Sequence, residues 1–193
     1  MENQTVKPWV GENYESPAIF PYKTFIVGES NYTETEEQFN EDLVNSCVSD
    51  DFTGSDRKGF GRFATKLRRT IFGRDSNMIP AEFWPHVAFC NFVQFRVGDA
   101  ARMRPKPEMW RDSPPAFFKV AAQLKPERIL VLGVDNWRNI LQAAPHEKVS
   151  EHQALLQLDG QKILAGYVWH PSAPRFSYDP WSPIAAELLL KKP

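Results

Sequence analysis

Two short segments, far apart in the chain, each place polar side chains directly after an apolar run. These side chains are Glu29, Ser30, Asn31, His170 and Ser172. A carboxylate or a carboxamide can stabilise a cation or orient a water molecule, and an imidazole can donate a proton to an oxygen on which charge develops. The combination predicts a site that breaks or holds a polar molecule, provided that the fold brings both segments together.

Two further apolar runs end in polar residues of the same kind, namely Asn91, Gln94, Asp135 and Asn136. In an open α/β sheet, ligands bind at the edge where the carboxyl ends of the strands meet. Each residue also has a purely structural interpretation. Asn31 and His170 can shape turns. Asn91 can bond backbone groups, and Asp135 can cap a helix. We expect the four segments to converge, because a structural role at all four places at once requires more coincidence than one shared site.

Strands and helices must alternate along the chain to build such an edge. Apolar runs predict strands at residues 25–27, 87–93, 128–132, 154–158 and 162–169, the last two as a hairpin. Helix signals, including a capping box of Thr35 and Gln38, predict helices at residues 35–48, 60–73, 114–124, 135–141 and 182–192. This alternation predicts an α/β fold with three layers, α/β/α, around a mostly parallel central sheet of about four strands. Residues 1–22 are expected to form an irregular arm on a single domain of residues 1–193.

The net charge of −1 hides an uneven distribution along the chain. Residues 1–56 have a net charge of −10, residues 57–111 of +8 and residues 112–193 of +1. In the middle third, residues 60–73 predict an amphipathic helix. Its basic face comprises Lys58, Arg62, Lys66 and Arg69. No acidic residue lies between positions 57 and 74, so this face is either an ordinary solvated surface or a surface for phosphates.

The composition excludes several classes of protein. No run approaches the ~18 apolar residues that cross a bilayer, and residues 1–11 lack the apolar core of a secretory signal. We therefore expect a cytoplasmic protein with no membrane partner. Cys47 and Cys90 are too few for a cysteine-ligated iron–sulfur cluster, and no metal or other cofactor is expected. The glycine-rich loops of nucleotide-binding modules and the nucleophile elbow of α/β hydrolases are absent from the sequence.

The motifs resemble those of the uracil-DNA glycosylase superfamily over most of the chain, from about residue 25 to residue 190. Residues 27–32 (VGESNY) are similar to its first motif, which reads GQDPY in the uracil branch and GEAPG in the iron–sulfur branch. Residues 170–172 (HPS) match the opening of its HPS motif. Residues 89–93 (FCNFV) look like the strand whose Asn reads the base, and residues 126–133 (PERILVLG) look like the third core strand.

The resemblance implies an enzyme that flips a nucleotide out of DNA and hydrolyses its N-glycosidic bond, leaving an abasic site. Its catalytic residues would be Glu29, Asn31 and His170, with the first two beside the cationic sugar and the imidazole donating to the departing base. The base-binding residues would be Asn91, Tyr32 and Phe60, although Phe60 can equally pack in the core. The DNA-binding residues would be Ser172, Arg175, Phe176, Lys58, Arg62, Lys66 and Arg69, with Arg175 or Phe176 filling the vacated base stack.

The chain departs from the uracil branch at two positions of the first motif. Ser30 stands where that branch has its catalytic Asp, and Asn31 stands where it has Pro. Glu29 is the carboxylate of the GE-type branches. The resemblance thus implies that the base is uracil or a modified pyrimidine, including hypermodified phage bases with a role in antiviral defence.

Two other classes of protein remain compatible with the sequence. A catalytically inactive nucleic-acid-binding member of the same fold would explain Ser30. A small-molecule hydrolase or nucleotide-binding module lacks its own motif and leaves the basic stretch 57–74 unexplained. For the enzyme we expect DNA, as duplex or single strand, as the partner and a monomer as the oligomeric state.

Overall fold

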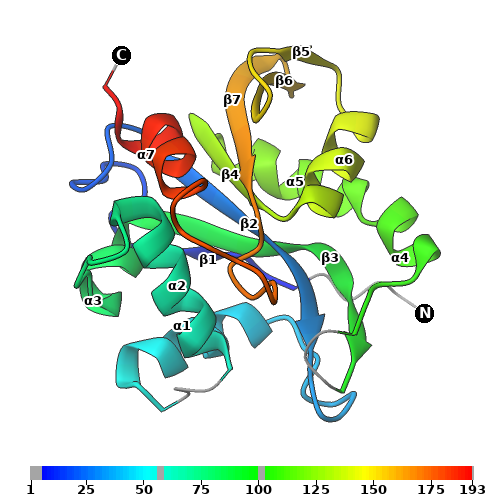
Figure 1. Cartoon of the computed structure of the whole chain (residues 1–193). Helices are drawn as coiled ribbons and strands as arrows, with labels where there is room; N and C mark the ends of the chain where they lie inside the picture. The colour runs from blue at the N-terminus through cyan, green and yellow to red at the C-terminus, as the bar shows by residue number, and fades with distance from the viewer. Residues whose placement is uncertain (1–5, 56–58, 100–102, 193) are drawn as a thin grey trace.

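A computed structural model of the chain describes residues 6–55, 59–99 and 103–192. Within this part of the chain one sheet of seven strands has the order β1-β3-β2-β4-β7-β6-β5 (Figure 1). The strands are β1 (Trp9–Val10), β2 (Thr24–Tyr32), β3 (Val87–Gly98), β4 (Arg128–Leu132), β5 (His146–Lys148), β6 (Gln153–Leu158) and β7 (Gln161–Val168). The central strands β3, β2, β4 and β7 are parallel, and the outer strands join them in antiparallel pairs.

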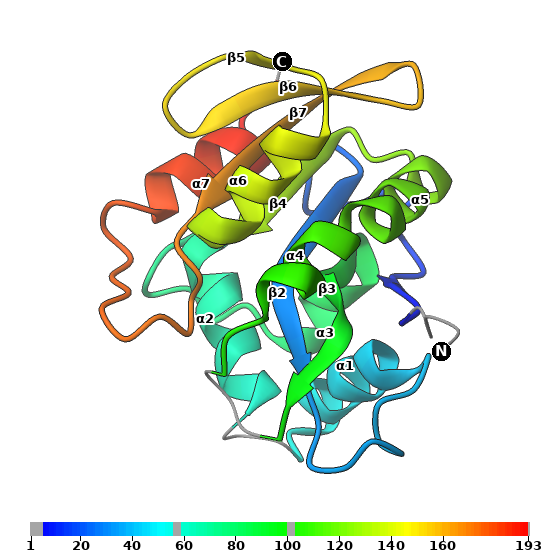
Figure 2. The same cartoon turned by 90° about the vertical axis from the view of Figure 1, so that its right-hand side faces the viewer.

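Helices cover both faces of this sheet (Figures 1 and 2). One face carries α1 (Leu43–Thr53), α2 (Phe60–Phe72), α3 (Pro80–Phe83), the short 3-10 helix η1 (Trp84–His86) and α7 (Ser182–Leu190). The other face carries α4 (Pro107–Asp112), α5 (Pro114–Leu124) and α6 (Val134–Ala143). Alternating residues of a strand point to opposite faces, so Phe25 packs in one core and Ile26 in the other. No described helix is long and apolar enough to cross a bilayer.

The predicted α/β class with a mostly parallel sheet centre is confirmed, but the sheet has seven strands rather than about four. The N-terminal arm supplies β1, which pairs Trp9 with Phe89 of β3. At the opposite edge, β5 consists of three exposed polar residues. Neither strand could be predicted from the sequence, because two residues are too few to form a pattern and the three residues of β5 bury no apolar side chain.

The first motif lies within a strand rather than after one. The strand expected at residues 25–27 continues to Tyr32, and Gly28 pairs with Asn91 in the parallel register of β2 and β3. At their carboxyl ends, β2 and β3 extend further along the sheet than the neighbouring strand β4, which ends at Leu132. The pairing of β2 with β3 shifts in register between Ser30 and Tyr32. The polar residues of the motif therefore stand on an extension of the sheet at its carboxyl edge.

The prediction of a helix that begins at Thr35 was wrong. Gln38 Oε1 does accept the backbone N–H groups of Glu34, at 2.9 Å, and Thr35, at 3.2 Å, and the Thr35 bond is one of the two that a capping box requires. The bonds close a turn only, and α1 begins at Leu43. Buried apolar residues at helical spacing, such as Val44 and Val48, occur only from there onward.

One cation of the basic helix α2 is buried inside the protein. Arg68 Nη1 donates to Asp51 Oδ2 of α1 at 2.6 Å, and the two side chains are only 6% and 5% exposed. Trp84 Nε1 donates to the same oxygen at 2.7 Å. The acidic first third of the chain thus neutralises part of the basic middle third, and Arg68 links α2 to α1 instead of facing solvent.

Candidate functional site

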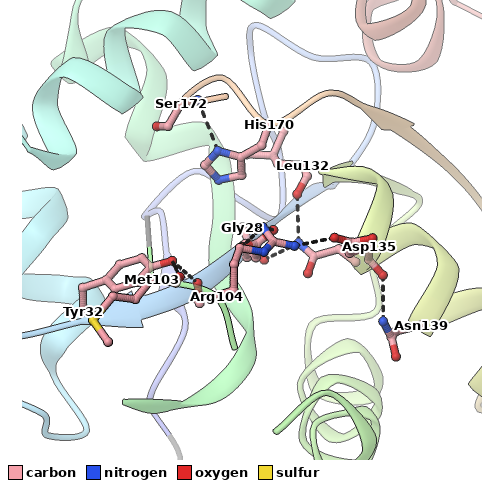
Figure 3. A network of polar contacts seen from close by, with 12 residues as sticks. Gly28, Tyr32, Met103, Arg104, Leu132, Asp135, Asn139, His170 and Ser172 are labelled. Atoms are coloured by element: carbon pink, nitrogen blue, oxygen red, sulfur yellow. Dashed lines mark hydrogen bonds and ion pairs between the residues drawn. The ribbon is translucent and has the colours of Figure 1, made fainter. Parts of the chain in front are cut away.

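A buried carboxylate pairs with an exposed guanidinium at the carboxyl edge of the sheet (Figure 3). Arg104, from the segment between β3 and α4, donates from Nη1 to both oxygens of Glu29, at 2.8 and 3.1 Å. Its Nη2 donates to Asp135 in the first turn of α6. The Glu29 side chain is 11% exposed and that of Arg104 is 58% exposed. Burial raises the pKa of Glu29, and the charge of Arg104 opposes that rise.

Asp135 is therefore not the helix cap expected from the sequence. The N-cap position of α6 belongs to Gly133, and the Asp135 carboxylate instead holds Arg104. Together, Glu29 and Asp135 fix Arg104 between the end of β2 and the start of α6.

The imidazole of His170, just after β7, is held by contacts from its own loop and from α2. The backbone N–H of Ser172 donates to His170 Nδ1 at 3.2 Å. The ring stacks on Phe63, with centroids 5.3 Å apart and an interplanar angle of 18°. Three residues along α2, Lys66 Nζ donates to the carbonyl oxygen of Pro171 at 3.0 Å. These contacts fix the His170 loop beside α2 (Figure 2).

The His170 ring is neutral and carries its proton on Nε2. Burial, together with the positive charges of Arg104 and Lys66, lowers the pKa of His170 to about 4. At pH 7 the ring is therefore uncharged. Because Nδ1 accepts the Ser172 N–H, the single ring proton belongs on the other nitrogen. The ring is thus prepared to donate a hydrogen bond to a ligand oxygen.

Glu29 and His170 both lie close to Gly133, the residue that follows β4. A Cβ placed on Gly133 would lie 3.7 Å from Glu29 Oε2 and 3.7 Å from His170 Cβ. The φ angle of Gly133 is +106°, a conformation that residues with a Cβ rarely adopt. Glycine therefore permits the turn and adds no Cβ at this point, close to the Glu29 carboxylate and to the Cβ of His170. Asn136 Nδ2 ties this corner together by donating to the carbonyls of Gly28 and Leu132, both at 2.8 Å.

The carboxamides of Asn91 and Asn31 form a bonded pair across β3 and β2. Asn91 Nδ2 donates to Asn31 Oδ1 at 2.8 Å, and Asn31 Nδ2 donates to the Val93 carbonyl at 3.0 Å. A Cβ on Gly28 would overlap Asn91 Oδ1, so Gly28 lets the Asn91 side chain lie across β2. Asn31 is 3% exposed. Its carboxamide is thus directed at Asn91 and the strand rather than at solvent, whereas Asn91 is half-buried at the edge.

Ser30 and Tyr32 bond to each other and to the segment after β3. The Ser30 hydroxyl donates to the Tyr32 phenol oxygen at 2.7 Å, and the phenol donates to the Met103 carbonyl at 2.8 Å (Figure 3). Burial raises the pKa of the Tyr32 phenol. Ser30 therefore holds Tyr32 against the segment that also supplies Arg104.

Phe60, expected to stack on a base, packs among other aromatic rings. Its ring centroid lies 5.5 Å from that of Phe63 and 5.8 Å from those of both Trp84 and Phe89. The ring that reaches the site is Phe63, which contacts His170. The sequence pattern could not show which of Phe60 and Phe63 reaches the site, because both lie on the same apolar face of α2.

The residues expected to bind DNA occupy two places in the fold. Arg62 and Arg69 are exposed on α2, whereas Lys66 is half-buried and bonded to the His170 loop. That loop carries exposed Ser172 and Arg175 and half-buried Phe176. Lys58 lies outside the described residues.

Arg104 is the site residue that the sequence did not reveal. It belongs to no motif, and its partners Glu29 and Asp135 lie 75 and 31 residues away along the chain. The strong basic bias of residues 57–111 pointed to a cationic region but not to this member of it.

Two open cavities lie away from this edge. The larger, of about 450 Å³, is lined by Lys23, Lys125, Pro126, Glu127, Arg128, Gln161, Lys162 and Ile163. The second, of about 390 Å³, lies between α5, the end of α6 and the β6–β7 turn. Neither is lined by Glu29, His170 or Asn91, so the site rests on converging side chains at the sheet edge rather than on cavity size.

No protein-family model matches the chain, and no curated protein sequence matches it. The chemical groups at this sheet edge nevertheless indicate what the site can do. A carboxylate of raised pKa, a neutral imidazole donor and a carboxamide stand at one sheet edge beside an arginine. Such a set can stabilise a positive charge and a nearby negative charge in the same bound molecule.

The pKa of His170 can be measured directly by NMR titration of its ring protons. We expect a midpoint near 4 in the wild type, and a higher midpoint in Lys66→Met, because that change removes one of the positive charges that lower the pKa. Arg62→Met on the exposed side of the same helix is the control and should leave the midpoint in place. A wild-type midpoint near 6.5 would show that the ring is solvated rather than held as described.

Proposed function

We propose that this protein is a DNA glycosylase with a uracil-DNA glycosylase-like fold, which hydrolyses the N-glycosidic bond of uracil or a modified pyrimidine and leaves an abasic site. The observation that carries the proposal is that the Glu29 carboxylate and the Cβ of neutral His170 both lie close to Gly133. The fold is supported by the parallel strands β3 and β2, which contain two of the motif segments, and β7, which ends just before the third. DNA is the proposed partner.

The two groups suit the charges that develop when the bond between sugar and base breaks. The sugar becomes positively charged and the base leaves with the electron pair of the bond. The Glu29 carboxylate would stabilise the sugar cation and orient the water whose oxygen bonds to the sugar carbon. The proton that this water loses balances the negative charge of the departed base. His170 Nε2–H would donate to the base oxygen on which negative charge collects. A neutral donor suits this role, since it adds a hydrogen bond without a competing positive charge.

Asn91 is the residue proposed to recognise the base. A carboxamide offers one acceptor and two donors, which matches the amide-like edge of a pyrimidine. Asn31 would act through Asn91 by fixing its orientation, because Asn31 Oδ1 accepts the Asn91 amide. Tyr32, which is bonded to Ser30 and Met103, would border the bound base.

Base release from synthetic DNA tests the proposal. Labelled oligonucleotides, single-stranded and duplex, would carry uracil, hypoxanthine or 5-substituted cytosines, and alkali would cut at any abasic site formed. Strand breaks at a pyrimidine base support the enzyme. Binding without breaks for every base would indicate the inactive nucleic-acid-binding alternative, and the absence of both would overturn the proposal.

Replacing His170 with Ala should slow base release on the order of 10²-fold at saturating DNA, because one donor to the developing negative charge is lost. His146→Ala is the matched control, since His146 is an exposed histidine on the edge strand β5. Single-turnover rates measured by alkaline cleavage give the comparison. Equal rates for the wild type and His170→Ala would remove the imidazole from the mechanism.

A further inference from the structure

An exposed indole lies directly beside the candidate site in the sequence. Trp169 is 39% exposed, although it is among the largest apolar side chains. Its ring stacks on that of Trp181, with centroids 5.7 Å apart and an interplanar angle of 24°. None of the roles assigned above uses either tryptophan. Part of the Trp169 indole therefore remains open to solvent just after the carboxyl end of β7.

This indole is held in place by further rings. The Trp181 centroid lies 6.0 Å from that of Tyr167, which in turn stacks on Trp137 of α6 at 5.5 Å and 27°. His152 meets Tyr167 and Trp181 edge-on, at 5.2 and 5.6 Å. Trp169 is thus the exposed end of an aromatic column, and ordering its ring costs little when a ligand binds.

The column also closes the loop that carries the site. Trp169 and Trp181 stand at the two ends of residues 169–181, and their stacked rings hold these ends together. The loop between them contains His170, exposed Ser172 and exposed Arg175. An exposed aromatic face therefore continues directly into the loop proposed to bind DNA.

We propose that Trp169 is a stacking platform for an unpaired nucleobase next to the nucleotide in the site, an inference that rests on the proposed DNA glycosylase function. Every nucleobase has a flat π-face, and one base stacked on an aromatic side chain contributes roughly 1–3 kcal/mol. Flipping a nucleotide disturbs the stacking of its neighbours. A prepositioned indole beside His170 would take up one exposed neighbouring base and thereby favour DNA that is already unpaired.

Oligonucleotides with and without bases separate stacking from contacts to phosphates. The probes are a fluorescein-labelled 15-mer of thymidine and a 15-mer of the same backbone made only of tetrahydrofuran abasic residues, compared by fluorescence anisotropy. Both carry the same phosphates, so their affinity ratio reports contacts to bases. We expect the wild type to prefer the thymidine 15-mer, and Trp169→Ala to weaken its binding about 10-fold while leaving the abasic 15-mer unchanged.

Two further variants test whether the effect belongs to the ring. Trp169→Phe keeps an aromatic face and should retain most of the preference. Ile79→Ala is the control, because Ile79 is a 51% exposed apolar residue away from the column. Loss of both affinities in Trp169→Ala would show that the change disturbs the whole loop, which contradicts a stacking role.

The outcomes keep the two proposals apart. If the wild type binds neither 15-mer and releases no base, the glycosylase proposal fails and the platform fails with it. If the wild type binds and cleaves DNA, but Trp169→Ala has the wild-type affinity ratio, only the platform is overturned. A Trp169 surface that serves another protein would give this second result.

Discussion

Replacing Glu29 with Gln is expected to lower the rate of base release about 10³-fold at pH 7, the larger of the two catalytic losses predicted for this site. Gln keeps the shape of the side chain but removes the charge opposite the developing sugar cation, a change of the size seen when a positioned charge or general base is lost. The change also places an amide against Arg104, which in the wild type donates to both Glu29 oxygens. Single-turnover cleavage of the preferred oligonucleotide measures the effect.

Asp135→Asn is the matched control for Glu29→Gln, because Asp135 is the other carboxylate bound to Arg104. It should lower the rate much less, since Asp135 holds the arginine but does not border Gly133. Equal losses in the two variants would mean that the position of Arg104, rather than the Glu29 charge, limits the reaction.

The pH profile follows from the same carboxylate. Burial raises the pKa of Glu29 above 4.5, so the active ionised form is lost at a higher pH than for a solvated Glu. As the pH falls, the rate should therefore fall through a midpoint above 4.5, before His170 becomes protonated at about 4. Because Arg104 opposes the rise, Arg104→Met should move this midpoint to still higher pH.

Local patterns in the sequence were sufficient for the central strands and for most helices. β4 and α5 have the predicted limits, and the hairpin of β6 and β7 forms as expected. β4 is a continuous run of buried apolar residues, and α5 begins with two prolines, so the signals that predict them are local. No helix begins at Thr35, although Gln38 accepts the Thr35 N–H as in a capping box, because no buried face follows until Leu43.

The site was only partly predictable, because its decisive contacts are not local. The motif residues Glu29 and His170 could be named from the strands that precede them. Their surroundings could not: Arg104 reaches Glu29 across 75 residues, and Lys66 reaches Pro171 across 105. The sequence also did not indicate that Arg68 is buried against Asp51, because the two residues lie on different helices.

The buried pair of Asp51 and Arg68 leads to the largest stability prediction. Both side chains are almost fully buried, and Asp51 Oδ2 accepts Arg68 Nη1 at 2.6 Å and Trp84 Nε1 at 2.7 Å. Asp51→Ala leaves a guanidinium and an indole N–H buried without that acceptor. Removing one partner of a buried ion pair costs about 3–5 kcal/mol, so urea unfolding should show a loss of that size. Asp50→Ala, an exposed neighbour on α1, should change little.

The buried pair also affects the candidate site, because Arg68 belongs to α2, the same helix that holds the His170 loop. Phe63 stacks on His170 and Lys66 bonds Pro171 from the same helix. If α2 shifts in Asp51→Ala, burial of the imidazole decreases and its NMR titration midpoint should rise from about 4 toward 6.5. Asp51→Leu combined with Arg68→Met removes both charges and should recover most of the stability. A double variant as unstable as Asp51→Ala would show that packing around Trp84, rather than the uncompensated charge, determines the loss.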